Sequence, residues 1–249
     1  MLLKSRGVIC GIVGGVCLLL FAACDPSQNP DLANNLMSAL MNPSASSSLD
    51  ASTVAAGLKE ALEVGTARTV DLTSKTDGFL ANQLIRIGMP DQLKGMAQTL
   101  RTLGMGAQVD QLETSMNRAA ELAAAEARPV FVDAVKGMTI SDAMGILNGG
   151  NTAATDYFRS KTESTLAGKF KPIVASKLNE VGLYRTYKPL ADTYSSLPLV
   201  TTPAVNLEQY VTDKSLDGLF TVLAEQETLI RKDPAARTTE LLKKVFASR

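Results

Sequence analysis

The stretch from Val109 to Ala123, VDQLETSMNRAAELA, decides the fold class of this 249-residue chain. Apolar side chains recur in it every three or four residues, and this spacing places them on one face of an α-helix. These positions are Val109, Leu112, Met116, Ala119, Ala120 and Ala123. Because several of them are small alanines, a neighbouring helix can approach this face closely.

Apolar stripes of the same period continue on both sides of that stretch, over almost all of residues 49–249. They predict one all-α domain of about ten short to medium helices. Hydrophobic residues make up 45% of the chain but aromatic residues only 5%, so the core is expected to consist mainly of Leu, Val, Ile, Met and Ala. Two short pieces, residues 84–87 and 197–201, look more like strands.

Capping residues predict where individual helices begin and end. Helix ends are expected at Gly65, Gly104 and Asn148-Gly149-Gly150, and helix starts at Thr139 or Ser141, at Asn206 and at Asp233-Pro234. Pro129 fits the first turn of a helix, whereas Pro172 should break or kink the long helix that contains it. The last helix would bury one face made of Leu241, Leu242, Val245 and Phe246.

The N-terminus has the three-part layout of a secretory signal. Lys4 and Arg6 precede an uncharged apolar run from Val8 to Ala23, and Cys24 follows two alanines. The sequence Leu20-Phe21-Ala22-Ala23-Cys24 resembles the lipobox of bacterial lipoproteins, in which the chain is cut before the cysteine and its sulfur receives diacylglycerol. We therefore expect residues 1–23 to be a signal peptide and residues 24–48 an acylated, palmitate-bearing cysteine followed by a polar tether.

An uncleaved membrane helix is the alternative reading of the N-terminus. A glycine-containing run of that length barely spans the roughly 30 Å of bilayer hydrocarbon, which favours the lipoprotein reading. The domain is then expected on the periplasmic face of a bacterial membrane, anchored by its lipid. Asp25 directly after the cysteine resembles the inner-membrane retention signal of enteric bacteria and favours the inner over the outer membrane.

Composition excludes several classes of function. The chain has no His, and its three cysteines all lie at or before Cys24, so we expect no metal site, no cofactor and no disulfide framework. Lys+Arg and Asp+Glu number 25 each, and Lys4 and Arg6 belong to the signal, so the remainder is slightly acidic. That balance gives no electrostatic reason to bind nucleic acid. The expected partners are the membrane, through the lipid, and a protein or small ligand in the periplasm.

Five short stretches resemble the bacterial family DUF4197, a domain of unknown function found in exported proteins. They are residues 56–62 (AGLKEAL), 77–80 (DGFL), 116–121 (MNRAAE), 216–220 (LDGLF) and 233–239 (DPAARTT). The likeness covers nearly all of residues 50–247, in order and at compatible spacing. It implies no activity and assigns no catalytic residue.

Two polar groups are the candidate pocket or interaction residues. Asn117, Arg118 and Glu121 lie on the alanine-rich helix, where a charged cluster either lines a groove or simply pairs on the surface. Asp156, Tyr157 and Arg159 form the second group. Asp133 with Asp142, and Glu121 with Glu126, are conceivable acid–base pairs, although no catalytic residue can be assigned.

Two functions remain open at this stage. The first is a non-catalytic binding or interaction module held near a membrane, and the second is a hydrolase or lyase that uses carboxylates and Arg in a helical pocket. A cleft lined jointly by Arg118, Glu121, Asp156 and Arg159 would favour the enzyme, whereas scattered, solvated placement would favour the binding module.

Replacing Cys24 tests the lipoprotein reading. Cys24→Ser should abolish both incorporation of labelled fatty acid and partitioning into the detergent phase, because the hydroxyl does not accept diacylglycerol. Lipid still carried by the variant would show that the lipobox reading is wrong.

Overall fold

Helix α4 (Gly106–Ala124) contains the stretch that decides the fold and lies at the centre of the domain. Four of its alanines, Ala119, Ala120, Ala123 and Ala124, are fully buried, which lets the backbones of other helices come close. Helices α2, α3, α7, α8 and α9 all pack against it. The predicted amphipathic helix is therefore confirmed, and it serves as the element around which the others assemble.

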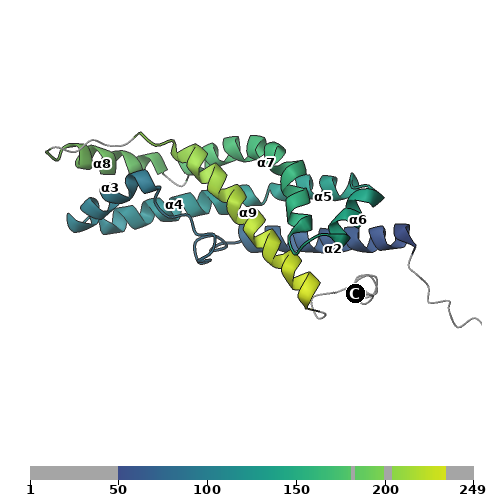
Figure 1. Cartoon of the computed structure of the whole chain (residues 1–249). Helices are drawn as coiled ribbons and strands as arrows, with labels where there is room; N and C mark the ends of the chain where they lie inside the picture. The colour runs from purple at the N-terminus through teal and green to yellow at the C-terminus, as the bar shows by residue number, and fades with distance from the viewer. Residues whose placement is uncertain (1–49, 181–182, 199–203, 234–249) are drawn as a thin grey trace, which may run out of the picture. The chain divides into compact units, whose positions relative to one another are not determined.

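The computed structural model describes residues 50–180, 183–198 and 204–233, which belong to one compact all-α unit. Besides α4, its helices are α2 (Ala51–Ser74), α3 (Asp91–Thr102), α5 (Ala127–Lys136), α6 (Ile140–Asn148), α7 (Ala153–Glu180), α8 (Leu183–Ser195) and α9 (Leu207–Lys232) (Figure 1). The all-α prediction is confirmed. The described part holds fewer than the predicted ten helices, because the stretches on both sides of Pro172 form the single helix α7 and the predicted C-terminal helix lies outside the described residues.

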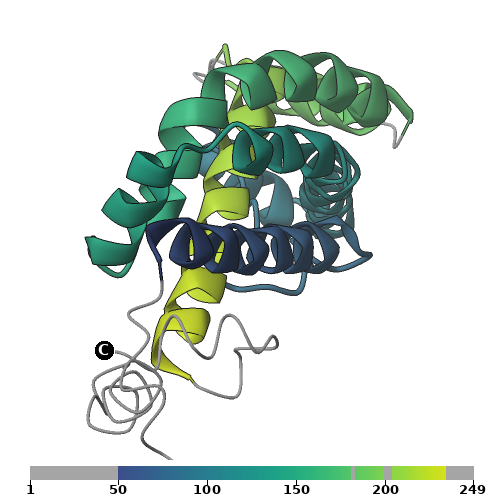
Figure 2. The same ribbon diagram turned by 90° about the vertical axis from the view of Figure 1, so that its right-hand side faces the viewer.

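Helix α9 crosses the other long helices and contacts α2, α4 and α7 (Figures 1 and 2). Three buried aromatic rings meet beneath it, Phe131 from α5, Phe158 from α7 and Phe220 from α9. The Phe131 ring lies edge-on to the other two, with centroids 5.4 and 6.2 Å away. Each such edge-on pair stabilises the fold by about 0.5–1.5 kcal/mol beyond the contribution of the surface area it buries. A few aromatics thus anchor a core that is otherwise aliphatic.

Most predicted helix boundaries are confirmed because they depend on local chemistry. Gly104 follows α3 with a φ of +82°, the left-handed conformation that glycine adopts without strain. Thr139 and Asp142 form a reciprocal capping box at the start of α6. The Asn206 side chain accepts a hydrogen bond of 2.9 Å from the Gln209 amide and caps α9. Pro129 lies in the first turn of α5.

Two local predictions are wrong, and tertiary packing explains the first. Helix α2 continues through Gly65, which packs against Ile230 of α9. Residues 84–87, expected to resemble a strand, belong to a loop, and the described residues contain no strand. The other strand-like piece, residues 197–201, lies mostly outside the described residues. Helix α7 runs through Pro172 without ending, so the proline does not break it, and Phe170 and Val174 on either side are buried.

The loop of residues 75–90 joins α2 to α3. Near its start, Asp77 has a φ of 65°, and the following turn inserts the fully buried Phe79 ring against α9. Gly218 of α9 provides the space: a Cβ there would lie 2.5 Å from Phe79 Cε1. A long loop is thereby tied into the hydrophobic core.

Several expectations fall outside the described residues. These are the signal peptide, Cys24 and the tether, and also the C-terminal helix with its face of Leu241, Leu242, Val245 and Phe246. Within the described part of the chain, none of the helices has the length and apolar character that a membrane crossing requires.

Two glycine-to-alanine substitutions should shift stability in opposite directions. Gly218→Ala forces a methyl group into the buried Phe79 ring, and overpacking of about 1–3 kcal/mol outweighs the gain in helix propensity. Gly95→Ala, inside α3 with nothing within 4 Å of the added Cβ, should stabilise by about 0.5–1 kcal/mol. Thermal melts of both variants beside the parent provide the measurement. A Gly218→Ala variant as stable as Gly95→Ala would contradict the close contact between loop and helix.

Candidate functional site

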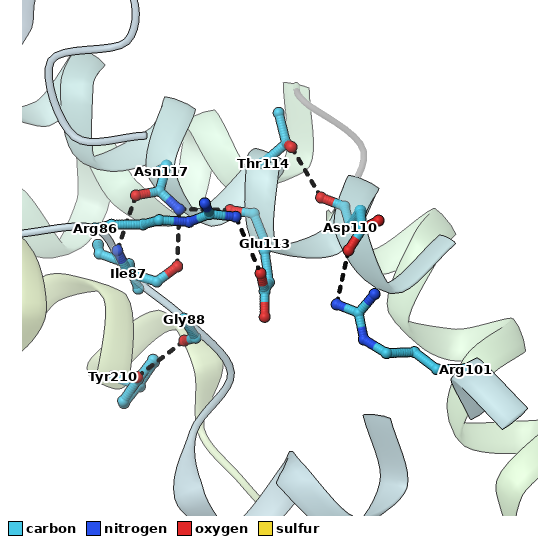
Figure 3. Close-up of polar contacts among 9 residues, drawn as sticks. All are labelled: Arg86, Ile87, Gly88, Arg101, Asp110, Glu113, Thr114, Asn117 and Tyr210. Carbon is cyan, nitrogen blue, oxygen red and sulfur yellow. Dashed lines mark hydrogen bonds and ion pairs between the residues drawn. The ribbon is translucent and has the colours of Figure 1, made fainter. Parts of the chain in front are cut away.

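Asn117 fixes one end of the 75–90 loop to helix α4. Its fully buried side-chain amide accepts a hydrogen bond from the Ile87 backbone N–H at 2.9 Å and donates one to the Ile87 carbonyl at 2.8 Å. The same nitrogen also lies 2.8 Å from the Glu113 carbonyl. Figure 3 shows the amide facing Ile87 in the manner of a paired strand. An isolated extended segment thus obtains the backbone partners that a sheet would supply.

Glu121 and Arg118 fix the other end of the loop. Glu121 is buried, and one of its oxygens accepts hydrogen bonds of 3.2 Å from the backbone amides of Phe79 and Leu80. Its second oxygen pairs with Arg118 at 2.7 Å, and Arg118 also reaches Asp77 at 2.7 Å. The hydrogen bond to Glu121 is the main cause of a raised Arg118 pKa. Arg118 and Glu121 do pair, but Glu121 is buried and not on the surface, and the clamp joins residues more than forty positions apart in the sequence.

The second predicted group lies on α7. The exposed Asp156 carboxylate accepts a hydrogen bond from the Thr152 hydroxyl at 3.2 Å, at the start of that helix. Arg159 pairs with Glu163 at 2.7 Å, and its guanidinium lies 4.5 Å from the centroid of the Phe220 ring on α9. Tyr157 packs edge-on against Phe158. The described cavities include none lined jointly by Arg118, Glu121, Asp156 and Arg159.

A different surface forms a large open groove of about 730 Å³, which we call the α3–α9 groove. Helix α3 supplies one side, the end of the 75–90 loop supplies a wall, and α4 and α9 supply the remainder. Its lining residues are Gly88, Met89, Asp91, Gln92, Lys94, Ala97, Gln98, Arg101, Glu113, Tyr210 and Lys214. The Tyr210 hydroxyl donates a hydrogen bond of 3.0 Å to the Gly88 carbonyl, so the wall is tied to α9 as well as to α4 (Figure 3).

The charged groups of the α3–α9 groove are arranged in ion pairs. Lys94 lies 2.6 Å from Asp91, Arg101 lies 2.7 Å from Asp110, and Arg86 at the groove edge lies 3.4 Å from Glu113. Lys214 lies 3.7 Å from Asp217. The hydrogen bond between Lys94 and Asp91 lowers the pKa of the carboxyl and raises that of the ammonium. Both groups therefore stay charged around neutral pH and are poorly suited to exchanging protons.

A second, smaller groove of about 450 Å³ lies between α5, the start of α6 and α7, and we call it the α5–α7 groove. It brings together Asp133 and Asp142, one of the carboxylate pairs considered from the sequence, with Tyr157, Lys161 and Lys169. The backbone hydrogen bond from Thr139 is the main cause that lowers the Asp142 pKa. Asp142 is thereby held as a carboxylate that caps a helix and not as a proton donor.

Glu227 and Arg231 of α9 form a polar centre that the sequence reading missed. Glu227 accepts hydrogen bonds of 2.9 and 2.8 Å from the backbone amides of Ala154 and Thr155 at the start of α7. Arg231 pairs with Glu227 and donates to the Ile146 carbonyl at 2.8 Å. One sequence signal could have revealed it: Glu227 occupies a position of the apolar α9 stripe, four residues after Leu223 and three before Ile230.

Metal-ligating residues do not gather in the described part of the chain. None of its groups of acidic residues is arranged to hold a metal ion through three or more side chains. Every buried side-chain nitrogen and oxygen there has a hydrogen-bond partner.

The fold and these grooves define an all-α domain with open, polar surface grooves. Residues 48–247 match the family model described as "Protein of unknown function (DUF4197)", and the chain belongs to this family. The resemblance read from the five short stretches is thereby confirmed. The comparison with curated proteins found no match, and neither did the comparison with solved structures.

Replacing Asn117 tests the clamp that shapes the groove wall. Asn117→Ala leaves the buried Ile87 N–H and carbonyl without partners, at about 1–3 kcal/mol each, or roughly 2–6 kcal/mol in total. The melting temperature should fall by roughly 5–15 °C. Asn179→Ala is the matched control, because that exposed side chain bonds only within its own helix. An Asn117→Ala melt no lower than the control would show that the loop does not depend on this amide.

Proposed function

We propose that the protein is a membrane-tethered periplasmic lipoprotein whose helical domain is a non-catalytic module that binds its partner through the α3–α9 groove. The signal peptide, lipobox cysteine and polar tether predicted from the sequence support the proposed location at the periplasmic face of a membrane. The geometry of the groove supports the binding role.

The observation that carries this proposal is the way the groove wall is held. The segment from Arg86 to Pro90 has no regular secondary structure, yet Asn117 and Tyr210 fix its backbone from two helices that are far apart in sequence. Such a wall keeps its shape without a ligand, and preorganisation of this kind reduces the entropic cost of binding. Ligand sites are typically concave and largely formed in advance.

The pairing of charges in the groove favours binding over acid–base chemistry. A general base works best with a pKa near the working pH. Ion pairing moves the pKa values of Asp91 and Lys94 away from neutrality, and that of Arg101 upward through its bond to Asp110. These groups can orient a ligand through the donors and acceptors that their ion pairs leave unused, and exposed pairs of this kind contribute little to stability.

The alternative is a hydrolase or lyase that uses carboxylates in a helical pocket. Convergence of Asp133 and Asp142 in the α5–α7 groove is the observation in its favour. The capping role of Asp142 weakens it, because the lowered pKa of that carboxyl opposes the protonated form that a general acid needs. Arg118 and Arg159 are used in other contacts. We therefore place the functional surface in the α3–α9 groove.

Photo-crosslinking in intact bacteria tests the groove as the binding surface. A photoreactive residue in place of Gln98, inside the groove, should give a discrete adduct whose mass identifies the bound molecule. The same residue in place of Gln108, an exposed glutamine of α4 that does not line the groove, is the control.

Two outcomes would contradict the proposal. Adducts of equal yield at both positions would show that capture is unspecific. No adduct at Gln98, with the protein correctly acylated and folded, would show that the groove is not the surface through which the domain binds.

A further inference from the structure

We propose that the α3–α9 groove binds an uncharged oligosaccharide rich in hydroxyl and acetamido groups. This inference rests on the binding role proposed above and specifies its ligand. The N-acetylated glycan strands of the bacterial cell wall have this chemistry and occupy the compartment in which we place the domain.

Charge balance is the first argument for an uncharged ligand. Lys94, Arg101 and Lys214 line the groove, and each has an acidic partner within 2.6 to 3.7 Å. An anionic ligand would have to displace these carboxylates and would meet little net positive potential in return for its own desolvation. A neutral ligand can use the outer lone pairs and N–H groups of the ion pairs without separating them.

Two amide side chains provide the second argument. Gln92 and Gln98 line the groove from successive turns of α3, and neither side chain makes a hydrogen bond to another residue of the described chain. Each offers two donors and one acceptor. The Tyr210 hydroxyl donates to Gly88, which leaves its oxygen free to accept a further bond. Such a mixture of donors and acceptors matches sugar hydroxyls, which also do both.

The shape and lining of the groove favour a sugar chain over a peptide. Peptides in extended form usually add to a sheet edge or place side chains in apolar pockets. The described part of this domain has no strand, and the apolar lining consists of the buried residues Met89 and Ala97. An open surface with a small apolar floor and polar sides suits pyranose rings, whose faces are apolar and whose edges carry hydroxyls.

Gly88 gives a way to block the groove without disturbing the fold. It lies in the wall, and a Cβ added there would have nothing within 4 Å. Gly88→Leu should therefore fill part of the groove while the contacts of Ile87 and Tyr210 remain. Unlike substitution of Asn117, this change tests the groove separately from the stability of the domain.

The experiment titrates the full chain, in a detergent without a sugar headgroup, with the β-1,4-linked tetramer of N-acetylglucosamine and follows the heat of binding. Binding should weaken about tenfold or more in Gly88→Leu and in the double variant Gln92→Ala/Gln98→Ala, as the loss of two hydrogen bonds would give. Gln108→Ala is the matched control and should bind as the parent does. Binding should change little between low and high salt, because no net charge is neutralised.

A second arm separates a free oligosaccharide from the cell wall as the source of the ligand. Sedimentation with purified, insoluble cell-wall sacculi should capture the parent and not Gly88→Leu, and the free tetramer should compete for this capture. Capture by the insoluble glycan identifies the wall strand as the ligand, and binding of the tetramer alone would assign a soluble oligosaccharide.

The sugar assignment is overturned if the tetramer fails to bind, if Gly88→Leu binds it as tightly as the parent, or if an extended tetrapeptide or inorganic phosphate binds there instead. If the tetramer does not bind while position 98 still gives a specific adduct in cells, the proposed binding role is kept and only the sugar assignment is wrong. If the tetramer does not bind and position 98 gives no adduct, the proposed binding function is wrong as well.

Discussion

The helix assembly depends on the hydrogen bonds and the ion pair that the Glu227 carboxylate makes. The first amides of any helix lack partners within that helix, and Glu227 of α9 supplies them for α7 through Ala154 and Thr155. Its negative charge also lies at the positive end of the α7 dipole. A buried carboxylate is costly unless it is paired and hydrogen-bonded, and Arg231 completes the arrangement by neutralising Glu227 and binding the last turn of α6. One charged pair therefore fixes the mutual positions of three helices around an aromatic-poor core.

The same physical solution recurs where the chain leaves helical structure. Glu121 satisfies two backbone amides of the 75–90 loop and is neutralised by Arg118, as Glu227 is by Arg231. The uncharged amide of Asn117 likewise bonds to the loop backbone, at the N–H and carbonyl of Ile87. Both clamps stand on α4, whose alanines bring the neighbouring backbones near enough for short polar side chains to reach. The groove wall is consequently shaped by buried polar contacts of the same kind as those that hold the helices together.

Sequence reading succeeded where the cause is local and failed where it is not. Gly104, Thr139 and Asn206 end or begin helices through bonds to residues within one turn, so the pattern alone predicts them. Gly65 carries the same local signal as Gly104, yet helix α2 runs through it where it packs against Ile230. The Asn117–Arg118–Glu121 group was recognisable as polar residues on a close-packed helix, but its partners lie some 30 to 42 residues away and no spacing rule connects them. The α3–α9 groove was not foreseen because its residues come from four separate elements.

Polar groups are used differently in the interior and in the groove. This difference explains why we expect ligand recognition to depend on hydrogen bonds between uncharged groups. Inside the domain, Glu121 and Glu227 are fully used by backbone amides and arginines, so neither is available to a ligand. At the groove, the charged side chains have opposite charges beside them, and their net field is small. The groove combines a fixed backbone wall at Gly88 with the amides of Gln92 and Gln98, which bond to no other residue of the described chain. In the binding mode that we propose, directional hydrogen bonds from this rigid frame would select a ligand by the positions of its hydroxyl and amide groups, and the small net charge would avoid attracting anions in general.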